Sequence, residues 1–273
     1  MNAPSTFPDP GNPERNLGEF KIVGTGDPVI TALLIESDRG RNFRLPGTEE
    51  LLEQTIDGQS IEKKLIGIAK VGGVKVDPIP EQPERYATNR LALSENDYKL
   101  RREVIQPMMR EAGMEVEEHP LADIGIFRGQ YPEVTPLVLA SHTDTVPDGD
   151  MYDGVYGVIS AIESVKAMSE IGFKPYRDII VLSYTGEESS RFGIACFGSR
   201  AIFHGLNTKE LDSREKQELG GRSIREVLGE DGAKIASEPI FGEGKKFKKP
   251  FAVIELHFEK SALIEVCICK VRD

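Results

Sequence analysis

Short apolar runs alternate with amphipathic segments in the middle of the chain, which predicts strands and helices in alternation. Residues 136–140 (PLVLA) and 178–183 (DIIVLS) are typical of strands that are buried on both faces of a parallel sheet. Between them, Val158, Ile162, Val165 and Met168 recur every three or four residues, which predicts an amphipathic helix over 155–171. The segment 136–186 is therefore predicted to be a βαβ unit with a right-handed crossover. Residues 251–256 (FAVIEL) predict one more strand.

Other helices are predicted on both sides of this unit. The pattern places them from Thr48, over 61–69, over 97–112 with an interruption at Pro107, over 198–203 and over 223–228. Residues 1–50 are rich in Pro, Gly, Asn and Asp, so we expect a loosely ordered N-terminal extension. Residues 51–273 are then one α/β domain, a three-layer αβα sandwich with a mostly parallel sheet.

Composition limits the partners. A formal charge of −11 over 273 residues argues against nucleic acid and anionic membranes, and no apolar run is long enough to span a bilayer. The N-terminus lacks a secretion signal, so we expect a cytoplasmic protein. The three cysteines are an odd number without framework spacing, which predicts reduced thiols. We interpret Cys267 and Cys269 as buried strand residues.

Side chains that commonly bind metal ions follow the predicted strands. His142 follows the first apolar run, Glu187 and Glu188 follow the second, and His257 ends the third. Because ligands bind at the carboxyl ends of parallel strands, these side chains are expected at one rim of the sheet. His119 and His204, by contrast, are interpreted as structural, and the pair Met108–Met109 as core.

Imidazole and carboxylate ligands together favour zinc, manganese or cobalt over calcium or magnesium. Asp144, two residues beyond His142, is placed to hold the other ring nitrogen of that histidine. Asp153, at the start of the next helix, has two oxygens and could bridge two cations. Gly186 allows a turn before the Glu187–Glu188 pair, so that one carboxylate binds metal while the other takes a proton from water. We therefore predict a divalent metal site, zinc before manganese or cobalt.

At these positions the chain resembles a known family. The matching stretches are residues 141–147, 152–158, 187–193, 198–201 and 255–259. They are similar to those of the metal-dependent amidohydrolases that comprise N-carbamoyl-amino-acid hydrolases, allantoate amidohydrolases and β-ureidopropionase-type enzymes, a branch of the dinuclear zinc exopeptidases. The resemblance extends from about residue 58 to residue 260.

The resemblance implies a hydrolase of linear amide or ureido C–N bonds, with a small-molecule substrate and two metal ions. It assigns metal ligands at four positions: His142, Asp153, Glu188 and His257. Asp153 would bridge the ions and Glu188 would hold the second one. Glu187 would be the general base, and Asp144 the partner of His142.

The chain also departs from the family pattern. Family members are homodimers and carry, after the region of His257, a lid and dimerisation domain and a further metal-binding histidine. This sequence has no histidine after His257, and Lys260-Ser261-Ala262 stands where the family has Gln-Gly-Pro. We therefore expect a catalytic domain that is incomplete at its C-terminus, without the lid, and with one firmly held metal in place of two.

Two alternatives stay open at this point. One is a shortened, non-catalytic homologue that binds a metal or acts as a regulatory partner. The other is a zinc exopeptidase, which uses the same ligands but cleaves peptide bonds.

Overall fold

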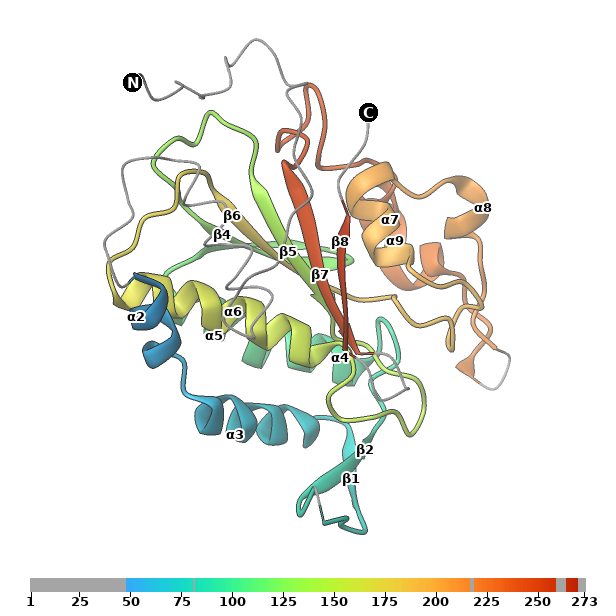
Figure 1. Cartoon of the computed structure of the whole chain (residues 1–273). Helices are drawn as coiled ribbons and strands as arrows, with labels where there is room; N and C mark the ends of the chain where they lie inside the picture. The colour runs from blue at the N-terminus through green and yellow to red at the C-terminus, as the bar shows by residue number, and fades with distance from the viewer. Residues whose placement is uncertain (1–47, 81, 217–218, 259–263, 270–273) are drawn as a thin grey trace, which may run out of the picture.

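The computed structural model describes residues 48–80, 82–216, 219–258 and 264–269, and their centre is a six-stranded sheet (Figure 1). The strands lie in the order β3-β4-β6-β5-β7-β8. Their bounds are β3 Glu115–His119, β4 Ala122–Phe127, β5 Leu137–His142, β6 Ile179–Tyr184, β7 Ala252–Phe258 and β8 Ile264–Cys269. A separate hairpin joins β1 (Gly73–Val76) to β2 (Arg85–Thr88).

The three central strands are parallel. β5 pairs with β6 from Leu137↔Ile179 onward, and with β7 from Leu137↔Ala252 onward. The pairs β3–β4, β4–β6 and β7–β8 are antiparallel, so β3, β6, β5 and β7 all run in one direction and β4 and β8 in the other. The chain passes from β5 to β6 through helix α6 (Val155–Glu170). The predicted α/β fold, its mostly parallel sheet and the βαβ unit are confirmed.

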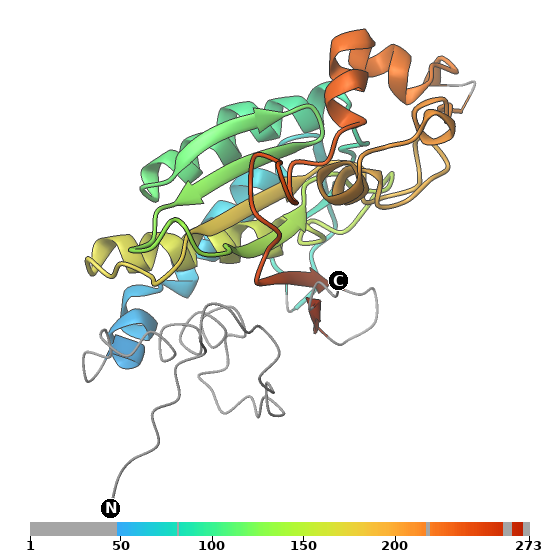
Figure 2. The same cartoon turned by 90° about the horizontal axis from the view of Figure 1, so that it is seen from above.

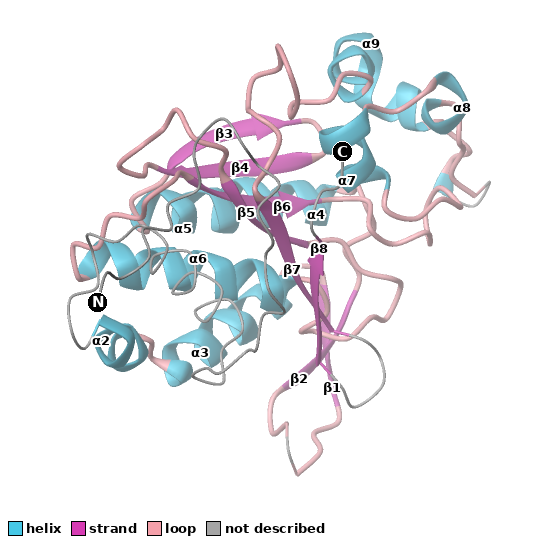
Figure 3. Ribbon diagram, turned by 45° about the horizontal axis from the view of Figure 1, so that its top comes forward, coloured by secondary structure: helices cyan, strands magenta, loops and turns pink. Residues whose placement is uncertain are grey.

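Helices cover both faces of the sheet, as Figures 2 and 3 show. Alternate residues of a strand point to opposite faces. Leu139, Val181 and Ile254 accordingly belong to the core on the side of α2 (Thr48–Thr55), α3 (Gly58–Ala69) and α6. Their neighbours in sequence face the other side, where Ile202 of α7 (Phe197–His204) packs. Two further helices, α8 (Thr208–Leu211) and α9 (Ile224–Ala236), lie beside α7.

The predicted helix over 97–112 is built in three parts. α4 (Glu95–Leu100) begins after Ser94, whose hydroxyl accepts the backbone N–H of Asp97. A π-helical segment, η1 (Arg101–Ile105), follows, and α5 (Gln106–Glu111) carries Pro107 in its first turn. Proline has no N–H to donate, and the change to π-helical bonding before it accommodates that loss. Pro107 therefore does not end the helix, which continues through it to Glu111; the irregular bonding lies before it, at Arg101–Ile105, and Met109 is fully buried.

Some elements differ from the sequence-based expectation. The first part of α9 ends before Gly229, as predicted, because the φ of 71° at Gly229 interrupts the helix; a second helical part, which was not predicted, continues to Ala236. The hairpin β3–β4 was not predicted, because β3 (EVEEH) is acid-rich and only partly buried. The expected N-terminal extension lies, up to residue 47, outside the described residues, and the domain boundary stays a prediction. Cys267 and Cys269 lie in β8 as predicted, but their side chains are outside the described part.

Among the described residues, no helix combines the length and apolar character that crossing a bilayer requires.

The interpretation of His119 as structural is confirmed, since it is buried at the end of β3. Its Nδ1 accepts the backbone N–H of Leu121 at 3.1 Å, which closes the β3–β4 turn. Burial, and next the charge of Arg101, lower the pKa of His119 to about 4.

His119 makes the stability of the fold sensitive to acid. The unfolded chain takes up a proton near pH 6.5 and the folded chain only near pH 4, so the contribution of neutral His119 is present above 6.5 and is lost as the pH falls. We expect His119→Asn, whose amide oxygen replaces Nδ1 as acceptor, to remove this dependence. Between pH 7 and 5, the wild type should lose about 2 kcal/mol more of its free energy of unfolding than the variant.

Urea denaturation at pH 7, 6 and 5 measures this difference. His204 is exposed at the end of α7, so His204→Asn is the matched control and should keep the wild-type pH dependence. Equal slopes for the wild type and His119→Asn would contradict the assignment.

Candidate metal centre

Three potential ligands converge at the carboxyl end of the parallel strands. His142 is the last residue of β5, Asp153 lies just before α6, and His257 is near the end of β7. Asp153 Oδ1 is 3.6 Å from His142 Nε2 and 3.9 Å from His257 Nε2, and the three ligand atoms lie within 4.8 Å of one another. The two imidazole ring centroids are 5.2 Å apart. Side chains from three separate parts of the sequence are thus within reach of one cation.

Two of these atoms have no hydrogen-bond partner among the described residues. His142 Nε2 and Asp153 Oδ1 are both buried and unpaired. A buried polar atom left without a partner costs about 1–3 kcal/mol, so such atoms need an explanation. A nitrogen lone pair and a carboxylate oxygen that face the same point fit a divalent cation of the zinc, manganese or cobalt type.

The ring of His142 is held from behind by Asp144. Nδ1 lies 3.0 Å from the backbone oxygen of Asp144 and 3.7 Å from its carboxylate Oδ1. With its proton on Nδ1, the ring donates to that backbone oxygen and leaves the Nε2 lone pair pointing to Asp153. From the sequence we expected the carboxylate of Asp144 to hold this nitrogen, whereas the atom within hydrogen-bond distance is the backbone oxygen of Asp144.

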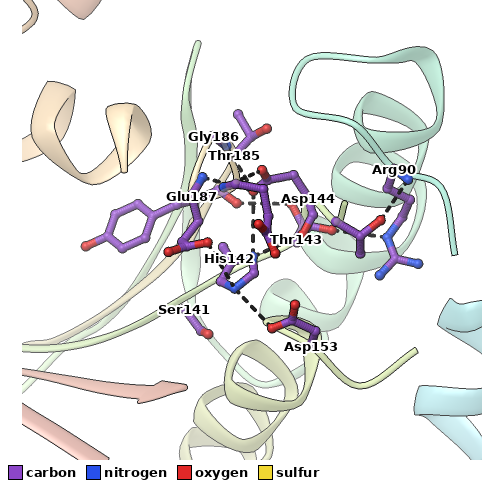
Figure 4. A network of polar contacts seen from close by, with 12 residues as sticks. Arg90, Ser141, His142, Thr143, Asp144, Asp153, Thr185, Gly186 and Glu187 are labelled. Atoms are coloured by element: carbon purple, nitrogen blue, oxygen red, sulfur yellow. Dashed lines mark hydrogen bonds and ion pairs between the residues drawn. The ribbon is translucent and has the colours of Figure 1, made fainter. Parts of the chain in front are cut away.

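The carboxylate of Asp144 binds the turn that carries the glutamate pair (Figure 4). Oδ1 accepts the N–H groups of Gly186 at 2.9 Å and Glu187 at 3.2 Å, and Oδ2 accepts that of Glu188 at 3.1 Å. Gly186 has a φ of 88°, and a Cβ there would lie 2.3 Å from the ring of Phe197. Glycine is therefore required at this turn on two counts, conformation and space.

The two glutamates lie beside the three ligands. Glu187 Oε2 is 4.0 Å from His142 Nε2, and its Oε1 accepts a long hydrogen bond of 3.7 Å from the thiol of Cys196. Glu188 is half-buried, and burial together with the charges of Glu187 and Asp153 raises its pKa to about 7.

Protonation offsets the negative charge of the crowded carboxylates at this site. Burial opposes the charged imidazolium of His142, but the Asp144 and Asp153 carboxylates outweigh it and raise the pKa of His142 well above its usual value. Burial likewise opposes the charge of Asp153, yet His142 keeps the pKa of Asp153 lowered. A divalent cation would displace the proton from His142 and neutralise the same carboxylates.

Comparison with known proteins finds a family model that matches the central part of the chain. Residues 124–238, which include β5, α6 and β6, match the family described as Peptidase family M28. The matched range carries His142, Asp153 and both glutamates, whereas His257 lies beyond it.

Individual relatives agree with the resemblance expected from the sequence. The chain is 32% identical to a ureidoglycolate hydrolase of Arabidopsis thaliana over 184 residues, 66% of this chain and 38% of that protein. It is 29% identical to an N-carbamoyl-L-amino acid amidohydrolase of Geobacillus stearothermophilus, over 77% of this chain and 48% of that protein. A solved structure of a putative amidohydrolase/peptidase from Burkholderia cenocepacia superposes with a TM-score of 0.60 at 30% identity, over 76% of this chain and 47% of that one. The chain thus spans less than half the length of these relatives.

Two buried charged residues, Arg90 and Asp97, hydrogen-bond the segments that carry the site, and neither was identified from the sequence. Arg90 is fully buried and donates from Nε to the backbone oxygen of Thr143 at 3.1 Å. Burial lowers the pKa of Arg90 to about 10, although Asp97, Asp144 and Asp153 oppose the shift. The contacts that join Arg90 to Thr143, and Asp97 to Thr143 and Thr185, connect positions 46 to 88 residues apart, so no local pattern in the sequence reveals them.

A glycine next to Asp153 gives a direct test of the metal centre. Gly154 has a φ of 67°, and a Cβ there would lie 2.5 Å from Nδ1 and Cε1 of His142. We expect Gly154→Ala to displace the imidazole and to weaken zinc binding at least about 10-fold, the scale seen when the support of a ligand is lost. Competition with a chromophoric chelator measures the affinity.

Gly172 is the matched control, because it has the same φ of 67° but a Cβ there would meet no atom within 4 Å. Gly172→Ala should lose about 1–2 kcal/mol of stability from the left-handed backbone and keep wild-type zinc affinity. Equal zinc affinity in both variants would show that His142 is not a ligand.

Proposed function

We propose that the chain uses this metal centre to hydrolyse linear amide or ureido C–N bonds in small molecules such as N-carbamoyl amino acids or allantoate. The observation that carries the proposal is the placement of a carboxylate, Glu187, within 4.0 Å of the unpaired Nε2 of His142. Three ligands and an adjacent base are the parts that metal-assisted hydrolysis requires.

His142, Asp153 and His257 would hold one divalent cation, with zinc favoured over manganese and cobalt by the two imidazoles. Three protein ligands leave a position open for water, as catalytic zinc sites do. The chemistry that a bound cation supplies is a lowered pKa for water and polarisation of the substrate carbonyl. Glu188, which interacts with Asp153, is the protein's contribution to a second cation position.

Glu187 is the proposed general base. Its backbone N–H is bound by Asp144, and its carboxylate is only partly exposed, so it is both positioned and reachable by solvent. Glu187 would take a proton from the attacking water and deliver it to the leaving nitrogen. Such proton transfer is worth about 10²–10⁴-fold in rate. Asp144 contributes by fixing the turn and the ring of His142.

The substrate class is supported by the names of the relatives. Besides the two hydrolases above, they include allantoate deiminase 1 of Glycine max, at 30% identity over 60% of this chain. The name of the matching family favours a second candidate, hydrolysis of peptide bonds by the same ligands. The third hypothesis is that the protein binds metal but is not catalytic, and an activity assay distinguishes it from the two hydrolase hypotheses.

The exchange Glu187→Gln separates catalysis from metal binding. It removes the proton acceptor but leaves the three ligands, so we expect kcat for a carbamoyl amino acid or allantoate to fall about 10²–10⁴-fold at unchanged zinc content. Ammonia release, with zinc, manganese or cobalt supplied, measures turnover, and elemental analysis measures metal. Glu170→Gln, an exposed change at the end of α6, should match the wild type in both.

The alternatives give different results. Loss of metal from Glu187→Gln would make Glu187 a ligand and reverse the roles of the two glutamates. Dipeptide cleavage by the wild type without ammonia release would select the peptidase. Metal binding without turnover of either substrate class would select the non-catalytic protein.

A further inference from the structure

Asp97 is a buried carboxylate outside the set of proposed ligands and base. It lies in the first turn of α4 with no exposed surface. Its Oδ1 accepts the hydroxyl of Thr143 at 2.9 Å, and its Oδ2 accepts the hydroxyl of Thr185 at 2.6 Å. Oδ2 also accepts the backbone N–H of Leu93 at 3.0 Å. One side chain therefore receives three hydrogen bonds from three different segments.

Two of these segments carry the metal centre. Thr143 stands between His142 and Asp144, directly after β5, and Thr185 directly precedes the turn of Gly186 and the glutamate pair. Thr143 and Thr185 have no exposed surface, and the N–H of Thr143 bonds to Tyr184 O at 2.9 Å. Asp97 thus ties the ends of β5 and β6 to each other and to α4.

The third partner, Leu93, is strained. Its φ of 58° is in the left-handed region, which costs a residue with a side chain about 1–2 kcal/mol. Its N–H is bound by Asp97 and lies 3.3 Å from Thr185 Oγ1. Strain that the surroundings maintain is concentrated at functional sites, so this backbone is an independent sign of such a site.

Burying the ionised carboxylate of Asp97 costs more free energy than a purely structural contact needs. Burial raises the pKa of Asp97 to about 6, and the carboxylate of Asp144 adds to this effect. The nearby Arg101 favours the charged form, but its guanidinium bonds to Asp123 and to backbone oxygens of β3 and its turn. Arg90 is the other cation that faces Asp97. An apolar side chain would fill this volume at lower cost, but it could not orient three donors.

We propose that Asp97 is a positioning residue for the metal centre: by holding Thr143 and Thr185, it sets the separation between His142 and the turn that carries Glu187 and Glu188. It acts together with Asp144, which binds the amides of that turn. The proposal rests on the metal site of the proposed function, but it does not depend on the substrate or on turnover.

The test compares Asp97→Asn with Asp178→Asn by zinc titration of the full chain. Asparagine offers one acceptor oxygen to three donors, so Asp97→Asn should weaken zinc binding about 10–100-fold, the usual loss for a group that orients ligands. Asp178 is the matched control, because it is also buried and accepts a backbone N–H, that of Gly129 at 2.8 Å, but at the opposite end of β6. Asp178→Asn should destabilise the fold and keep wild-type zinc affinity within about threefold.

A second pair of variants covers the case in which Asp97→Asn does not fold. Thr185→Val removes the hydroxyl at nearly constant volume, and Thr185→Ser retains it. We expect Thr185→Val to weaken zinc binding and Thr185→Ser to restore affinity to near the wild-type value.

The proposal is overturned if Asp97→Asn or Thr185→Val binds zinc as tightly as the wild type, or if Asp178→Asn loses affinity to the same extent. Zinc affinity that depends on Asp97, in a chain that hydrolyses no substrate, would retain this inference and reject the proposed function. Turnover by a chain whose zinc affinity does not depend on Asp97 would reject this inference and retain the proposed function.

Discussion

Parallel pairing of β5 with both β6 and β7 brings the functional groups together. The register sets His142 opposite Tyr184 and Ala140 opposite Glu255, so the last residues of three strands reach one edge of the sheet. Successive strand residues face opposite sides, and a shift of one position would turn His142 or His257 to the wrong face. The apolar residues on both faces, such as Val138 and Leu139, fix that register because each has a core to enter. The precision of the metal centre is thus a consequence of how the sheet packs.

Charge is the second constraint on the site. Asp144, Asp153 and Glu188 lie close together around His142, and the first two are buried while Glu188 is half-buried. Asp144 is stabilised by three backbone N–H groups, whereas the unpaired oxygen of Asp153 faces the imidazoles. The raised pKa values of His142 and Glu188 mean that protons bound there reduce the repulsion among these carboxylates. A bound cation would also reduce this repulsion, and it would give a partner to His142 Nε2 and Asp153 Oδ1, which have no hydrogen bond among the described residues.

Local patterns in the sequence were sufficient for the central elements and for the prediction that His142, Asp153 and His257 converge, which the structure places within 4.8 Å of one another. The apolar runs at 137–140 and 179–182 and the periodicity of α6 are strong because these elements are buried on two sides or along one wide face. The hairpin β3–β4 has no such pattern in its outer strand, and Asp97 looks like an ordinary residue in the first turn of a helix. Its function comes from Thr143 and Thr185, which only the folded chain brings near. The expected cytoplasmic location and the homodimer implied by the resemblance stay predictions.

Metal binding and substrate recognition are separable parts of this architecture. The three ligands, the proposed base and both positioning aspartates lie between positions 97 and 257, within one packed sheet and its adjacent helices. The ligand atoms of His142, Asp153 and His257 lie within 4.8 Å of one another in a chain that spans less than half the length of these relatives. In the proposed site, the sheet, Asp97 and Asp144 position these ligands and so set the affinity for a cation. The proposed base, Glu187, keeps part of its carboxylate exposed, so in this proposal a substrate approaches the site from the side of Glu187.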